Sequence, residues 1–225
     1  RDMKPDNLLW KNGDMSVLKI ADFGLAREIR SRPPYTEYIS TRWYRAPENI
    51  LRTNNYNSPI DIWACGVIMA ELFMAKPLFQ GNSETDQLYK IMAIIGPPTQ
   101  KTWPEGVAYA SKMGIHFPSS PACGLASVIP NASETALSLI SSMLRYDPSR
   151  RPSAGQCLRH PFFTNPPTDT NDISNTQNSS ISAKNHEEVT NSTSSNNKTY
   201  NNYQSLINSR NTNNQQSFNT RNSNN

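Results

Sequence analysis

The chain has 225 residues and a formal net charge of +4, and only 36% of its residues are hydrophobic. This fraction is low for a chain packed into one core along its whole length, so we expect part of it to be unfolded. The basic residues occur singly or in short groups, which argues against a nucleic-acid partner, and no run of eighteen or more apolar residues indicates membrane insertion.

The first predicted elements are a polar loop, "RDMKPDN" at residues 1–7, and an apolar, strand-like run at residues 16–24 that breaks at Gly24. A helix follows over residues 59–75, with Ser58 as the expected N-cap and Pro59 at the first helical position. Its apolar residues cover nearly every face, which is typical of a helix surrounded by other elements. We therefore expect this helix to be the centre of the core.

The remaining predicted elements are mostly one-sided helices. Residues 84–95 have apolar side chains at helical spacing, a Ser83 cap and a stop at Gly96. Residues 97–130 are rich in Pro, Gly and Ser and predict an irregular excursion with one short helix near residues 107–112. The pattern of a one-sided helix returns at residues 133–148, and a last short helix is expected to stop at Pro161.

Four polar residues near the start carry a pattern typical of phosphoryl transfer. Asp2 supplies a carboxylate that can accept or orient a hydroxyl proton, and Lys4 supplies a cation that offsets charge on the transferred phosphoryl group. The side-chain oxygen of Asn7 is a ligand for a hard ion such as Mg²⁺. Asp22 follows the predicted strand and precedes Gly24, where it predicts a second magnesium ligand.

The stretches "RDMKPDN", "DFGLAR", "TEY", "TRWYRAPE" and "DPSRRPSAGQCLRHPFF" resemble the C-terminal lobe of eukaryotic Ser/Thr protein kinases. The resemblance is to the MAP kinase and cyclin-dependent kinase group, and within it to the male germ cell-associated and intestinal cell kinases. It implies a mainly α fold over residues 1–163, with a short β-hairpin at the catalytic loop. Residues 164–225, rich in Asn and Ser, are predicted to be a disordered tail.

The resemblance implies an activity and its cofactors: transfer of the ATP γ-phosphoryl group to Ser or Thr of protein substrates, with ATP and Mg²⁺ bound. It implies that Lys4, Asn7 and Asp22 contact the nucleotide or metal, and that Thr41 hydrogen-bonds the catalytic Asp2 and Lys4. Activation by an upstream kinase is implied at Thr36 and Tyr38, because each phosphate adds about two negative charges.

Further roles follow from the same resemblance. Arg1 and Arg27 are expected to pair with phospho-Thr36, and Arg42 and Arg45 with phospho-Tyr38. Arg45 is also expected to shape a pocket for proline after the phosphoacceptor. Three residues have expected structural roles: a buried ion pair of Glu48 with Arg151, and Asp61 either gripping the catalytic-loop backbone or capping its own helix. Arg150 is interpreted as a solvated charge.

The printed residues contain no Gly-rich loop and no strand lysine for the nucleotide, so we expect the N-terminal lobe to be missing and the isolated chain to be inactive. A non-catalytic, lobe-only binding or decoy module is the alternative, and an unrelated phosphate-binding module is a third. The odd, widely spaced cysteines indicate reduced thiols. We expect a monomer in the cytoplasm, with a cilium or the nucleus as further candidate locations.

Overall fold

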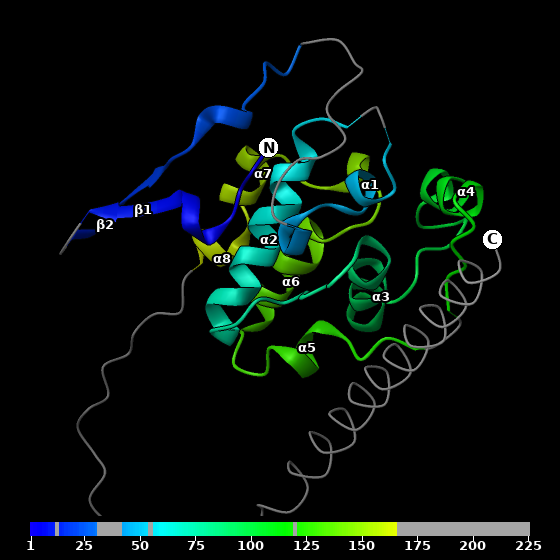
Figure 1. Ribbon diagram of the computed structural model, residues 1–225. Helices are drawn as coiled ribbons and strands as arrows, with labels where there is room; N and C mark the ends of the chain where they lie inside the picture. The colour runs from blue at the N-terminus through cyan, green and yellow to red at the C-terminus, as the bar shows by residue number, and fades with distance from the viewer. Residues whose placement is uncertain (12–13, 31–41, 54–55, 119–120, 166–225) are drawn as a thin grey trace, which may run out of the picture. The chain divides into compact units, whose positions relative to one another are not determined.

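The computed structural model describes residues 1–11, 14–30, 42–53, 56–118 and 121–165. It divides into two compact units, Arg1–Leu158 and Arg159–Asn225, which are treated separately (Figure 1). Thr36, Tyr38, Thr41 and the predicted tail beyond residue 165 lie outside the described residues. The first unit therefore contains the catalytic-type loop and nearly all of the described core.

A two-stranded antiparallel sheet follows the opening loop. Strand β1 (Leu8–Lys11) pairs with β2 (Asp14–Ile20), and Leu8 lies opposite Ile20. A short 3-10 helix, η1 (Pro5–Asn7), precedes the hairpin and another, η2 (Phe23–Leu25), follows it. The predicted hairpin is confirmed, but β2 begins earlier than the predicted strand and ends before Gly24, because Phe23–Leu25 turns into a helix.

Helix α2 (Pro59–Met74) is the centre of the first unit, as predicted, and buries residues on several faces, including Trp63 and Val67. It packs against α6 (Glu134–Met143), which lies beside it in Figure 1. A Cβ at Gly66 would lie 3.0 Å from Met143 Cβ, so a glycine here permits the close approach of the two helices.

The start of α2 differs from the prediction in one respect. Pro59 is the first helical residue, but the Ser58 side chain makes no capping hydrogen bond because its backbone is already in the helical region, with φ of −45° and ψ of −26°. The Oδ1 atom of Asn57 accepts a hydrogen bond from the Ser58 nitrogen at 2.8 Å. Ser58 therefore stands at the predicted N-cap position, but its side chain does not cap the helix.

The other helices confirm the mainly α prediction. Ser83 Oγ caps α3 (Glu84–Ile95) by accepting from Asp86 N at 3.1 Å, and Gly96 ends this helix with a φ of 83°. The remaining helical segments are η3 (Arg42–Tyr44), α1 (Pro47–Ile50), α3 (Glu84–Ile95), α4 (Pro104–Lys112), α5 (Leu125–Val128), η4 (Pro148–Arg150), α7 (Ala154–Leu158) and α8 (Pro161–Thr164).

Two short helices depart from the prediction. The excursion after α3 contains α5 as well as the expected α4, because Gly124, with a φ of 82°, allows the chain to turn into a new helix. At the other end, Pro161 begins α8 in the second unit instead of only ending a helix, since proline is compatible with a first helical position. In the described part of the chain, no helix is long and apolar enough to span a membrane.

Candidate active site

The opening loop holds three of the predicted catalytic residues close together. Lys4 Nζ lies 3.0 Å from Asp2 Oδ2, and the Asn7 amide donates a hydrogen bond of 2.8 Å to the Asp2 carbonyl oxygen. The helix η1 begins at Pro5, and Asn7 N donates to Lys4 O at 3.0 Å, which closes the loop. Asn7 is buried, so its side-chain position is fixed by the fold.

The hairpin brings the second motif back to this loop. Ala21 N donates a hydrogen bond of 2.8 Å to Asn7 O, directly before Asp22. Asp22 has left-handed backbone angles, φ of 55° and ψ of 77°, and its Oδ1 accepts from Gly24 N at 3.2 Å. Such a conformation is uncommon for a residue with a side chain and is often retained at functional sites.

Asn7 and Asp22 form a donor set that suits magnesium. The nitrogen of the Asn7 side chain is occupied by the Asp2 carbonyl, which leaves the amide oxygen as its ligand atom. Asp22 is exposed and lies two residues after the end of β2, the strand that pairs with the segment after Asn7. Magnesium prefers such oxygen ligands and keeps several waters or phosphate oxygens as well. The two residues therefore fit a shared metal held with a nucleotide.

The electrostatics of the loop keep Lys4 protonated. The hydrogen bond to Asp2 is the largest cause that raises the pKa of Lys4, and the negative charges of Asp2, Asp6 and Asp22 raise it further against an opposing effect of burial. The contribution of Asp22 places its charge within electrostatic reach of the Lys4 ammonium group. A cation and three carboxylates are thus gathered around the space beside the loop.

The residues around Arg1 form a small cavity of about 140 Å³, with Arg1 and Arg27 in its lining together with the acidic residues Glu28 and Asp61. Arg1 Nε donates to Leu25 O at 2.7 Å, and Arg1 Nη1 donates to Tyr56 Oη at 2.9 Å. The structure thus brings together the two arginines predicted to pair with phospho-Thr36. Asp61 Oδ1 lies 3.4 Å from the backbone nitrogen of Arg1, so its carboxylate contacts the catalytic-loop backbone.

Arg42 and Arg45, the residues predicted to pair with phospho-Tyr38, both contact the segment that leads into α3. Arg42 Nη1 donates to Asn82 O at 3.0 Å, and its buried Nε has no hydrogen-bond partner among the described residues. Arg45 is buried and its Nη1 lies 3.1 Å from Glu84 Oε1. Glu84 also pairs with Arg52 at 3.2 Å, so one carboxylate contacts two guanidinium groups.

Glu48 and Arg151 form a buried, bidentate ion pair that joins α1 to the segment after η4. Arg151 Nη1 and Nη2 donate to the two carboxylate oxygens of Glu48, each at 2.6 Å. Both side chains are buried, and the guanidinium group lies over the Trp63 ring, 5.1 Å from its centroid. The pair is distant in sequence and fixes the end of the segment that begins at Asp22.

Two buried polar side chains of the first unit, Tyr44 and Gln87, make contacts that the sequence did not predict. Tyr44 Oη donates to Glu71 Oε2 at 2.8 Å, and burial together with this hydrogen bond raises the pKa of Tyr44. Gln87 is fully buried, and its side chain accepts from Gly81 N at 2.8 Å and donates to Phe79 O at 3.2 Å. The sequence did show a polar residue, Gln87, on the apolar face of α3. The helical pattern alone, however, does not predict which groups this side chain contacts.

The family model described as "Protein kinase domain" matches residues 1–163. Over 163 residues the chain is 55% identical to human "Serine/threonine-protein kinase MAK", 54% identical to mouse "Serine/threonine-protein kinase ICK" and 53% identical to rice "Cyclin-dependent kinase F-3". These matches cover 72% of this chain, but only 26% of the human and mouse relatives and 37% of the rice relative.

Proposed function

The chain belongs to the protein kinase domain family, related to the MAP kinase and cyclin-dependent kinase group, and on that premise we propose that it is part of an active Ser/Thr protein kinase. The observation that carries the proposal is the hydrogen-bonded group of Asp2, Lys4 and Asn7. The backbone hydrogen bond from Ala21 N to Asn7 O joins this group to the segment that contains Asp22. This group contains a base, a cation and two oxygen ligands, as phosphoryl transfer requires.

Each residue of the group has a distinct task in the proposed reaction. Asp2 orients the substrate hydroxyl and accepts its proton, while its hydrogen bond to Lys4 holds the carboxylate in position. Lys4, whose pKa is raised, stays protonated and stabilises negative charge on the transferred group. Asn7 and Asp22 would hold the magnesium. Magnesium with ATP supplies the phosphoryl group and neutralises the charge that develops on its oxygens.

An apolar surface on the hairpin supports the presence of a covering domain in the active enzyme. Leu9 and Trp10 on β1 and Ile20 on β2 are 53%, 55% and 51% exposed, and Phe23 after β2 is 68% exposed. Large apolar side chains exposed together on one hairpin indicate an interaction site. We propose that a nucleotide-binding lobe covers it, and that a polypeptide of these 225 residues alone is inactive and prone to aggregation.

The finer proposals concern activation and specificity. Phosphates on Thr36 and Tyr38 would be bound by Arg1 with Arg27 and by Arg42 with Arg45. The shared cavity of the first pair supports this pairing. We propose that Arg45, which is buried and pairs with Glu84, lines the site for proline after the phosphoacceptor. Cytoplasmic, ciliary or nuclear placement stays a prediction.

The test is phosphoryl transfer by a chimera that joins the part of human MAK preceding the matched region to the complete chain. We expect magnesium-dependent transfer to a Ser-Pro peptide, and none from the 225-residue chain alone. Asp2→Asn should lower the rate by about 10²–10⁴-fold, since it removes the base. Asp6→Asn is the matched control, because Asp6 is an exposed carboxylate on the same loop.

Two results would contradict the proposal. A folded chimera without measurable transfer would favour the non-catalytic binding module. Equal loss of activity in the Asp2 and Asp6 variants would show that the loop needs its total charge and that Asp2 is not the base. If the 225-residue chain alone transferred phosphate and Asp2→Asn abolished this activity, the proposed covering lobe would be contradicted but the kinase function would not.

A further inference from the structure

A second cavity, of about 430 Å³, lies in the first unit and contains none of the residues of the catalytic-type loop. Its walls come from the end of α3, the turn before α4, the first residue of α5, the last part of α6 and the segment around η4. This volume is within the range of sites that bind peptides and small molecules. The phosphoryl-transfer proposal gives the cavity no role.

One side of the cavity is apolar and well ordered by the core. Leu125, Leu144 and the ring of Tyr146 are buried residues that contribute to its lining, together with half-buried Ile95. Tyr146 Oη donates to Gly96 O at 2.6 Å, which fixes the ring at the end of α3. Tyr146 also stacks on Trp103, with ring centroids 6.0 Å apart. This wall offers a rigid apolar surface.

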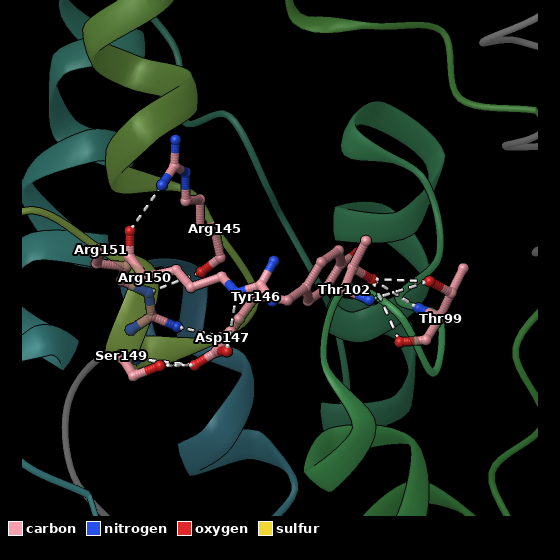
Figure 2. Close-up of polar contacts among 8 residues, drawn as sticks. All are labelled: Thr99, Thr102, Arg145, Tyr146, Asp147, Ser149, Arg150 and Arg151. Carbon is pink, nitrogen blue, oxygen red and sulfur yellow. Dashed lines mark hydrogen bonds and ion pairs between the residues drawn. The ribbon is translucent and has the colours of Figure 1, made fainter.

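The rim of the cavity carries two arginines in fixed positions (Figure 2). Arg145 Nη1 donates to the Arg150 carbonyl oxygen at 3.0 Å, and Arg150 Nε pairs with Asp147 Oδ2 at 3.4 Å. Asp147 is itself held, since its Oδ1 accepts from Ser149 N at 2.9 Å and from Ser149 Oγ at 2.6 Å. Arg150 is thus a positioned group, and not only the solvated charge expected from the sequence.

The two guanidinium groups keep donors available for a ligand. In the described residues, Arg145 uses one of its nitrogens for the Arg150 carbonyl, and its other donors have no hydrogen-bond acceptor. Among the same described residues, Arg150 pairs with Asp147 through Nε, so both of its terminal nitrogens remain available to donate hydrogen bonds to a ligand. The lining therefore contains two arginines and one carboxylate, so the rim keeps an excess positive charge. Guanidinium forks of this kind bind carboxylates through two parallel hydrogen bonds.

The opposite wall is a rigid polar turn. Thr99 N donates to Thr102 Oγ1 at 2.8 Å, and Thr102 N donates to Thr99 Oγ1 at 3.2 Å, so the two residues cap one another. Figure 2 shows this pair on the other side of Tyr146 from the arginines. Thr102 lines the cavity, and exposed Ser141 of α6 lines it as well. The cavity is therefore apolar at its base and cationic along one edge.

We propose that this cavity is a docking site for a linear acidic peptide segment of a partner protein. A bulky apolar side chain of the peptide occupies the wall of Leu125, Leu144 and Tyr146, and neighbouring Asp or Glu carboxylates bind Arg145 and Arg150. Charge complementarity selects this occupant, because an uncharged apolar segment would leave the remaining N–H donors of Arg145 and Arg150 without acceptors. The site would give a kinase a means of holding a partner away from the reaction centre.

The test measures fluorescence anisotropy of a fluorescein-labelled peptide, Gly-Glu-Asp-Leu-Phe-Asp-Glu-Gly, with the complete chain. Two control peptides carry Ser in place of Leu and Phe, or Gln and Asn in place of the acids. Arg145→Gln and Arg150→Gln should each weaken binding by about tenfold or more, as expected for a lost charged hydrogen bond. Ser141→Trp should block binding by filling the cavity without a change of charge.

Lys101→Gln is the matched control, because Lys101 is an exposed cation beside Thr102 that does not line the cavity. It should change the affinity by less than about twofold. Equal weakening by Lys101→Gln and Arg145→Gln would show general charge attraction and would overturn the proposal. Three other results would also overturn it: equal affinity for the peptide without Leu and Phe, unchanged peptide affinity of the Ser141→Trp variant, or no detectable binding at millimolar peptide.

Sedimentation of the same variants separates peptide docking from self-association. We expect the chain to sediment identically with and without Ser141→Trp. Concentration-dependent dimers that disappear in this variant would identify a second copy of the chain as the occupant and would overturn the peptide proposal. The Arg145→Gln variant keeps the test valid if Ser141→Trp fails to fold, because Arg145 is exposed and makes one hydrogen bond with the described residues.

Discussion

Replacement of Arg151 by Met should destabilise the chain by about 3–5 kcal/mol, because it leaves the carboxylate of Glu48 buried without a counterion. Every N–H group of the Arg151 guanidinium has an acceptor. Nε donates to Arg145 O, Nη1 to Glu48 and Pro59 O, and Nη2 to Glu48 and Tyr146 O. Met keeps an apolar chain beside Trp63, so the loss is mainly one of charge and hydrogen bonds.

The free energy of unfolding is measured by urea titration of Trp fluorescence, which is suitable because Trp63 lies under the guanidinium group. Arg151→Lys should lower the free energy of unfolding by less than Arg151→Met does, since an ammonium group keeps the positive charge but not the bidentate hydrogen bonds of the guanidinium group. Glu48→Leu combined with Arg151→Met should cost less than the sum of the single changes, because no buried charge remains. A cost below about 1 kcal/mol for Arg151→Met, or strict additivity of the two changes, would refute the reasoning.

Three further predictions concern buried groups elsewhere in the first unit. Tyr44→Phe should cost about 1–2 kcal/mol in urea denaturation, since Glu71 loses a hydrogen-bond donor. Because the pKa of Tyr44 is raised above its ordinary value of 10.0, its stabilising contribution is complete below pH 10.0 and is lost as the pH rises above it, and the phenylalanine variant should lack this loss. Burial raises the pKa of Cys65 to about 11, so this thiol should react slowest with iodoacetamide at neutral pH, as mass spectrometry of labelled peptides would show. Gly81→Ala should destabilise the turn before α3 by more than a surface change does, because a Cβ there would collide with Gln87, and thermal unfolding would measure the difference.

Sequence reasoning succeeded where a local pattern determines the structure. The Ser83 cap and Gly96 stop gave the bounds of α3, because both signals act on the nearest backbone groups. The core position of α2 followed from its nearly continuous apolar residues. The contact between the loops of Asn7 and Asp22 was implied by the resemblance to kinases, and the register of the hairpin accounts for it.

The failures arise where the outcome depends on residues distant in sequence. Tyr44 and Glu71 are far apart in the chain, and no periodicity indicates that a phenol and a carboxylate will meet. Gln87 lies on a buried face because three backbone groups outside its own helix satisfy its amide. Helix α5 is four residues long, too short to show a 3.6-residue period.

The position of Arg1 suggests how a phosphate on the activation segment could act on catalysis without touching the substrate. Its side chain lines the cavity shared with Arg27 and binds Leu25 O, its backbone nitrogen contacts Asp61, and the next residue is the proposed base, Asp2. A phosphate bound in this cavity would hold the Arg1 side chain on one side while α2 holds its backbone on the other. Asp2 would then be restricted at the residue beside it, while Lys4 and Asn7 restrict its side chain and its carbonyl. The proposed switch and the proposed base are thus joined through a single residue, so phosphate binding and hydroxyl activation should be sensitive to the same substitutions at Arg1.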